Sequence, residues 1–225
     1  MAIKLVIGNR NYSSWSLRAW VYLRESNIEF EEVFIPLHVR EGWRDEVASY
    51  SPAGRVPVLI DGDITVWDSM AIIGHLQEGY PSAVGWPENP EDRAFARSIS
   101  AEMHSGFIAL RNNLPQNLRM RRAAPITSEV QQQIDRIQDI WRECRERCGD
   151  RGPWLFGDFS IADVMFIPVA LRFVTYGIPV QARAAEFVAA TQNLPSVQQW
   201  ISDAEREEFS VDFVDELRAG DMVIG

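Results

Sequence analysis

The chain has 225 residues, of which 46% are hydrophobic and 24% charged, a composition typical of a globular protein with a sizeable core. Its formal net charge of −10 argues against nucleic acid or an anionic membrane as the main partner, since both attract clustered positive charge. No run of residues approaches the roughly 18 to 20 apolar positions that cross a bilayer. The first eight residues are typical of a strand and lack the features of a signal peptide, so we expect a cytoplasmic protein.

The two cysteines, Cys144 and Cys148, are four residues apart in a helical pattern. A disulfide along one helix is geometrically unfavourable, and a structural zinc site would need a second pair of ligands. We therefore expect two reduced thiols and no metal.

The first eighty residues alternate between strand and helix signals. An Asp61-Gly62 turn between two short apolar runs predicts a tight hairpin. We expect strands at 3–7, 29–36, 56–60 and 64–67, helices from Trp15 and over 70–78, and a helical or irregular stretch at 41–50. This order predicts a mixed sheet with helices on its faces, an α/β domain over residues 1–80.

Everything after residue 90 has helical periodicity. Residues 81–90 contain three prolines and little periodicity, so they form the expected linker. The expected helices are 91–114 (one long helix that Pro115 disturbs), 127–148, a central buried helix at 161–176, 182–191 and 196–206. Residues 91–225 therefore form an all-α domain.

Four short motifs occur in a fixed order along the chain. They are SSWSLR at 13–18, GRVPVL at 54–59, DSMAI at 68–72 and GDFSIAD at 157–163. In order and separation they resemble the cytosolic glutathione transferase family over essentially the whole chain. The resemblance implies a thioredoxin-like glutathione-binding domain followed by a helical-bundle domain that contributes the electrophile site. It also implies glutathione as co-substrate, a small electrophilic second substrate, no metal, and a homodimer.

The first motif carries the expected catalytic residue. A helix start gathers free N–H groups and so favours an anion, which the resemblance identifies as the glutathione thiolate. Glutathione's thiol, with an ordinary pKa of about 8.5, is mostly protonated near neutrality. Ser13 aligns with the activating serine of the serine-type classes and would donate a hydrogen bond to sulfur. Ser14 and Tyr12 are the alternatives, and Ser13 or Ser14 could instead only cap the helix.

The second and third motifs carry the other expected contacts to glutathione. The resemblance implies a cis Val56–Pro57 bond that turns the backbone of Val56 toward the cysteinyl part of glutathione; a trans proline at a strand edge is the alternative. Asp68 and Ser69 suit the ammonium and carboxylate of the γ-glutamyl end, although the family usually has Glu or Gln before this serine. Arg55 could meet the glycyl carboxylate.

Several further residues remain open. His38, Trp43 and Arg44 are possible contacts at the glycyl end, and Glu102, His104 and Arg111 are polar candidates for the electrophile site, which we expect between the domains along 102–120 and 165–176. The pattern S-x-x-D at Ser160 to Asp163 predicts a capping box, which belongs to folding.

The predicted activity is that of a glutathione S-transferase acting in detoxification, in which the thiolate attacks a hydrophobic electrophile or reduces a peroxide. The first motif is similar to that of the zeta class, whose known activity is maleylacetoacetate isomerisation, but Trp15 stands where that class has cysteine. A zeta-like isomerase is therefore one alternative. A non-catalytic glutathione-binding or scaffold protein on the same fold is another.

Overall fold

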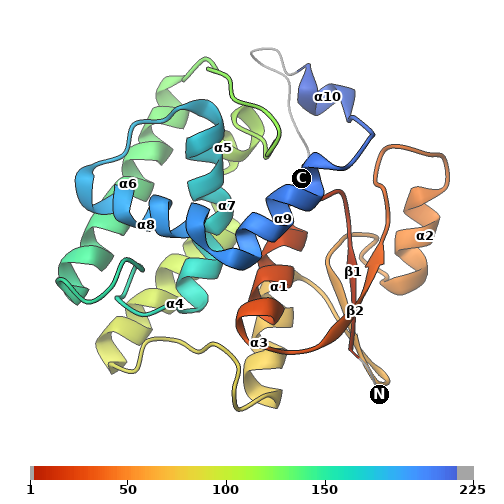
Figure 1. Ribbon diagram of the computed structural model, residues 1–225, viewed down its shortest axis with the longest axis horizontal. Helices are drawn as coiled ribbons and strands as arrows, with labels where there is room; N and C mark the ends of the chain where they lie inside the picture. The colour runs from red at the N-terminus through yellow and green to blue at the C-terminus, as the bar shows by residue number, and fades with distance from the viewer. Residues whose placement is uncertain (1–2, 217–225) are drawn as a thin grey trace.

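The computed structural model describes residues 3–216, and its N-terminal part is built on a four-stranded mixed sheet (Figure 1). The strand order is β2-β1-β3-β4, where β1 is Ile3–Ile7, β2 Phe30–Phe34, β3 Val58–Asp61 and β4 Ile64–Val66. β1 pairs in parallel with β2, whereas the other two pairings are antiparallel, and β3 and β4 form the hairpin that Asp61-Gly62 predicts.

Helices cover both faces of this sheet, as Figure 1 shows. Ile3, Leu5 and Ile7 of β1 belong to the main core, in which α1 (Ser14–Glu25) and α3 (Ser69–Gly79) take part. Val6 belongs to a separate small core with Val47 of α2 (Trp43–Tyr50). Because neighbouring residues of a strand point to opposite faces, this arrangement covers β1 on both sides and explains why its sequence is apolar except for Lys4.

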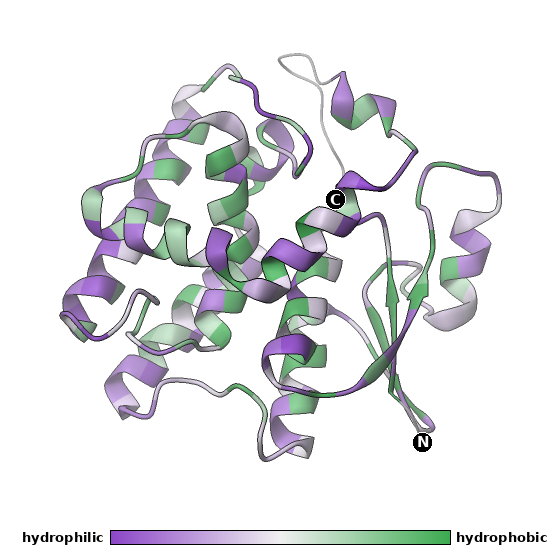
Figure 2. Ribbon diagram, viewed as in Figure 1, coloured by the Kyte–Doolittle hydropathy of each residue, from purple (hydrophilic) through white to green (hydrophobic). Residues whose placement is uncertain are grey.

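The rest of the described chain is helical. Its elements are α4 (Pro90–Ser105), α5 (Ile108–Asn113), α6 (Ser128–Cys148), α7 (Ile161–Tyr176), α8 (Ala182–Asn193), α9 (Pro195–Glu205) and α10 (Asp212–Asp215). α7 is buried along almost its whole length and contacts α1, α4 and α8. In Figure 2 it is largely coloured hydrophobic, while α6 carries hydrophilic residues on its outer side. The fold is thus a thioredoxin-like sheet domain followed by a helical domain, as the sequence predicts.

The expected single helix over 91–114 is wrong. The helix stops at Ser105, because Phe107 has a left-handed backbone conformation with φ of 59°. A Cβ atom at Gly106 would lie 2.8 Å from the carbonyl oxygen of Glu102, so the tight approach here requires glycine. The break comes before Pro115 and gives α5 a direction of its own.

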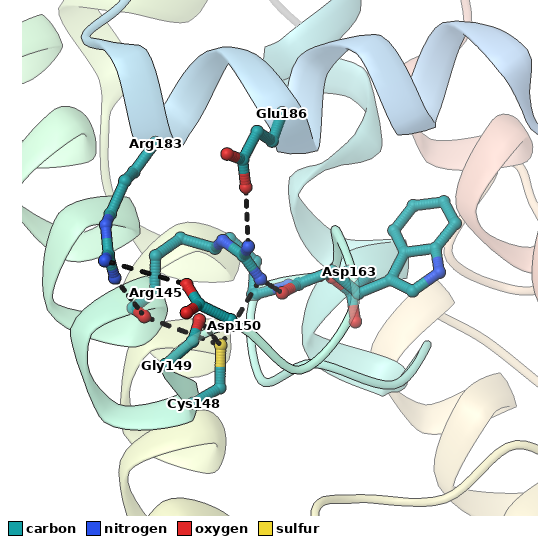
Figure 3. A network of polar contacts seen from close by, with 9 residues as sticks. Arg145, Cys148, Gly149, Asp150, Asp163, Arg183 and Glu186 are labelled. Carbon is teal, nitrogen blue, oxygen red and sulfur yellow. Dashed lines mark hydrogen bonds and ion pairs between the residues drawn. The ribbon is translucent and has the colours of Figure 1, made fainter.

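Both cysteines are free and buried in α6, and Cys148 contacts a buried arginine (Figure 3). Arg145 donates to the Cys148 sulfur at 3.3 Å, to the Trp154 carbonyl and, at 2.7 Å, to Glu186 of α8. Burial raises the pKa of the Cys144 thiol far above its ordinary value. Because the thiolate is the reactive form of cysteine, this shift disfavours reaction at Cys144. The hydrogen bonds of Arg145 tie α6 to α8 and to the loop between α6 and α7.

Candidate active site

The turn between β1 and α1 is organised by short hydrogen bonds around Ser13. The N–H of Ser13 donates to the Asn9 carbonyl at 2.8 Å, and its Oγ accepts from the N–H of Ser16 at 3.2 Å and lies 2.9 Å from the Ser16 Oγ. Ser13 is therefore the N-cap of α1. Since a hydroxyl has one proton and two lone pairs, capping leaves it able to exchange its contact with Ser16 for a bond to a ligand.

Ser14, the neighbouring candidate, faces the helical domain. Its side chain is buried, and its Oγ accepts a hydrogen bond from Nη2 of Arg172 in α7 at 3.2 Å. Ser13, in contrast, is only half-buried. The geometry therefore gives Ser14 a structural partner and leaves Ser13 the more accessible hydroxyl at the helix start.

Tyr12, the third candidate, is engaged elsewhere. Its hydroxyl donates to Asp215 of α10 at 2.7 Å and accepts from Arg119 at 2.8 Å and from the N–H of Val211 at 3.2 Å. Burial, reinforced by the hydrogen bond to Asp215, raises the pKa of this phenol above its ordinary value. Tyr12 thus anchors the C-terminal segment to the turn that carries Ser13.

The backbone near the second motif has free polar groups. The Val56–Pro57 bond is cis. Val56 lies before β3, and within residues 3–216 no backbone hydrogen bond outside the strands uses its N–H or C=O. Arg55 is exposed. The segment before β3 can accept an extended peptide, since each unpaired backbone group offers a partner.

The third motif begins α3. Asp68 caps the helix by accepting from the N–H of Met70 at 3.0 Å and of Ala71 at 3.4 Å. Its other oxygen lies 2.9 Å from Nε2 of His104 in α4, and this hydrogen bond lowers the pKa of the carboxyl against the effect of its partial burial. Ser69 is fully buried, and its Oγ has no partner among the described residues.

The sequence missed this use of Asp68. Asp68 and His104 are 36 residues apart on helices of different domains, and nothing local connects them. Of the other polar candidates on these helices, Glu102 turns away to make a bidentate pair with Arg136 of α6, with both distances 2.7 Å. Arg111 of α5 does approach the site, as its guanidinium carbon lies 4.7 Å from the centre of the Trp15 ring.

At the expected glycyl end, the rings of His38 and Trp43 pack at an interplanar angle of 48° beside the C-terminal segment. Their ring centres are 4.4 Å apart, and the ring of Phe213 meets that of His38 at 5.0 Å. Partial burial, with a smaller contribution from the charge of Arg44, lowers the pKa of His38. These contacts place His38 and Trp43 in one aromatic cluster with Phe213.

The capping box at the start of α7 is confirmed. The Asp163 carboxylate accepts from the N–H and Oγ of Ser160 and from the N–H of Leu155, each at 2.8 Å. Asp163 is fully buried and belongs to the fold.

Two family models match the chain, one for each part of the fold. Residues 12–78 match the glutathione S-transferase N-terminal domain, and residues 127–202 match the C-terminal domain. The chain belongs to the glutathione S-transferase family. A solved glutathione transferase homolog from Burkholderia GL BGR1 with bound glutathione has 26% identity and a TM-score of 0.70, covering 92% of this chain and all of its own.

Curated relatives divide into long and short matches. The maleylacetoacetate isomerase of Pseudomonas aeruginosa is 28% identical over 199 residues, or 84% of this chain and 92% of the relative. The dichloromethane dehalogenase of Methylophilus leisingeri is 38% identical over 66 residues, 29% of this chain. Three relatives of 32% to 38% identity are matched over only 23% to 47% of their own length.

Within residues 3–216, no helix is both long and apolar enough to cross a membrane. The same residues contain no group of three or more His, Cys, Asp or Glu side chains placed to hold a metal ion.

Proposed function

We propose that this protein is a glutathione transferase in which Ser13 stabilises the thiolate of bound glutathione. The observation that carries the proposal is the position of Ser13 at the N-terminus of α1, half-buried and with a hydroxyl that can turn from Ser16 to a ligand. A hydroxyl donor together with the free N–H groups of the helix start favours an anion, so it lowers the pKa of a thiol placed there.

The neighbouring groups suit the rest of the tripeptide. The unpaired N–H and C=O of Val56 fit the cysteinyl backbone, and the buried, unpartnered Oγ of Ser69 fits the γ-glutamyl carboxylate at the start of α3. Asp68 would share its carboxylate between His104 and the ligand ammonium. Arg55, exposed beside Val56, suits the glycyl carboxylate. The bound glutathione of the Burkholderia homolog supports glutathione as the ligand.

The chemistry follows from the ionised sulfur. The thiol proton leaves to solvent, the sulfur forms a bond to an electrophilic carbon, and the leaving group departs with its electron pair. Ser13 does not act as a base; it holds the charge that the thiolate carries. We expect the thiol pKa of bound glutathione to fall by about one to two units, and each unit corresponds to about 1.4 kcal/mol of thiolate stabilisation.

The decisive experiment follows the ultraviolet absorbance of the thiolate of bound glutathione against pH. In the unmodified protein the thiol pKa should fall by about one to two units from the free value, and Ser13→Ala should restore the free value. Ser14→Ala, changed one residue away, is the matched control and should keep the lowered pKa. An unchanged pKa in the unmodified protein would end the proposal, and a loss confined to Ser14→Ala would move the role to that residue.

A second candidate function is glutathione-dependent isomerisation of a maleyl substrate. It is favoured by the long match to the Pseudomonas aeruginosa isomerase. Trp15 counts against it, because a bulky indole fills the position after Ser14. Turnover of maleylacetoacetate without conjugation of simple electrophiles would support the isomerase.

A further inference from the structure

Three arginine side chains come together where α1, α5 and α7 meet beside the candidate active site. They are Arg18, Arg111 and Arg172. Their charges are close enough to act on one another: burial, and then the charges of the other two arginines, lower the pKa of Arg18 far below its ordinary value. Burial likewise lowers the pKa of Arg111 and of Arg172 to about 10.

The indole of Trp15 contacts two of the three arginines. The guanidinium carbons of Arg18 and Arg111 lie 4.6 and 4.7 Å from its ring centre, and the edge of the His104 ring meets it at 5.2 Å. Trp15 follows Ser14 directly, and the Oγ of Ser14 receives the hydrogen bond from Arg172. Trp15 and Ser14 therefore connect this cluster to the start of α1, where Ser13 is the N-cap.

Neutral groups satisfy most of these guanidinium nitrogens. Arg172 donates to the carbonyls of Leu114 and Pro168 besides Ser14, and Arg111 donates to the carbonyls of Met103 and His104. Arg18 donates from Nε to the Met165 carbonyl at 3.2 Å. Carbonyl and hydroxyl dipoles orient the guanidinium groups, but they do not neutralise their charge.

Carboxylates are scarce around the cluster. Among the described residues, Asp68 is the one whose charge raises the pKa of Arg18, and Asp68 is already bonded to His104. Both oxygens of Glu102 are taken by Arg136. Arg18, only 2% exposed, keeps a buried Nη1 with no hydrogen-bond partner in the described part of the chain. A buried positive charge without a counter-ion is costly, so an anion that arrives here gains binding energy.

We infer that the second substrate is an electrophile carrying a carboxylate, which Arg111 binds while the apolar part of the substrate lies against Trp15. Arg111 makes the contact because it is only half-buried. Arg18 and Arg172 are 2% and 7% exposed, so they do not touch the anion but attract it through their positive charge. This inference rests on the proposed function, because the thiolate at Ser13 is the nucleophile that such a substrate meets.

The test compares two electrophiles of equal size, 4-(chloromethyl)benzoate and 4-(chloromethyl)benzamide. The unmodified protein should prefer the carboxylate by about tenfold or more in kcat/KM, the effect expected of one charge-assisted hydrogen bond. Arg111→Gln should remove this preference, so that kcat/KM becomes the same for the carboxylate and the amide. Arg111→Lys, which keeps the charge, should retain part of the preference.

The matched control is Arg142→Gln, since Arg142 is a half-exposed arginine of α6 that pairs with Asp139 and Glu146 away from the cluster. It should keep the full preference. Equal rates for the two electrophiles in the unmodified protein, or the same loss in the control, would overturn the inference. So would an Arg111→Gln variant that slows both electrophiles equally and raises the thiol pKa, because the charge would then serve the thiolate.

A binding measurement separates this inference from the proposed function. 4-Methylbenzoate is titrated calorimetrically into protein saturated with S-methylglutathione, with 4-methylbenzamide as the neutral probe. Binding of the carboxylate that is about tenfold tighter, and lost in Arg111→Gln, supports the anion site even if no thiolate forms. Equal binding of both probes contradicts the site even if Ser13 ionises the thiol as proposed.

Discussion

At the scale of single residues, Tyr12 shows how a plausible catalytic side chain can be used for folding. Its hydroxyl bonds Asp215, Arg119 and the backbone of Val211. We expect Tyr12→Phe to leave the thiol pKa of bound glutathione unchanged and to lower the free energy of unfolding by about 1 to 3 kcal/mol, since partly buried partners lose a hydrogen bond. Urea unfolding and thiolate absorbance check both parts. A thiol pKa restored to the free value in this variant would instead make Tyr12 the activating residue.

The same scale shows what a sequence can predict about a site. The N-cap of α1 depends on groups within three residues, so the sequence restricts it to Ser13 or Ser14, and the structure shows that it is Ser13. The pairing of Asp68 with His104, and the approach of Arg111 to Trp15, depend on how α4 and α5 are aimed. The turn from α4 into α5 is made at the left-handed Phe107, a residue type with no preference for such a conformation, so no local signal predicts the approach of Arg111.

At the scale of elements, the start of α7 should make stability depend on pH. Burial outweighs the hydrogen bonds to the carboxylate and raises the pKa of Asp163 to about 6, above the ordinary value of 3.8. The folded state therefore binds this proton more tightly than the unfolded state. Stability from this group is largest below about pH 4 and falls as pH rises toward 6, by about 3 kcal/mol in total.

The measurement is urea unfolding between pH 4 and 8 for the unmodified protein and Asp163→Asn. The variant should lack this part of the slope, so the difference in unfolding free energy between the two proteins should change with pH. Ser160→Ala is the control: it should cost about 1 kcal/mol and keep the slope, because Asp163 still titrates. Curves for Asp163→Asn that run parallel to those of the unmodified protein would contradict the expectation.

Most elements could be predicted from periodicity, and the exceptions have local causes. The strands and the long helices have apolar patterns of period 2 or 3.6, and the hairpin has its Asp61-Gly62 turn. α10 has four residues and is too short to show a period. It is held in place by a hydrogen bond that Asn117, 98 residues earlier in the chain, donates to Asp215. The break after Ser105 was missed because apolar residues continue at helical spacing through it.

At the scale of the whole molecule, one hydrophobic core runs through both parts of the fold. It joins β1, α1 and α3 to the helices of the second part, and α1 packs on α7, where Arg18 donates to the Met165 carbonyl. Neither part can unfold without exposing the buried face of the other. We therefore expect one cooperative unit in which β1 and α7 open together.

Amide hydrogen exchange followed by mass spectrometry tests this directly. Peptides covering β1 and α7 should give opening free energies within about 1 kcal/mol of each other. Leu17→Ala, which opens a cavity at a fully buried position of α1, should lower both by the same amount, about 2 to 5 kcal/mol. Val47→Ala in the separate small core under α2 is the control and should loosen α2 first. If Leu17→Ala speeds exchange in β1 while α7 keeps its protection, the two parts unfold independently, and the interface between them adds less to stability than its burial predicts.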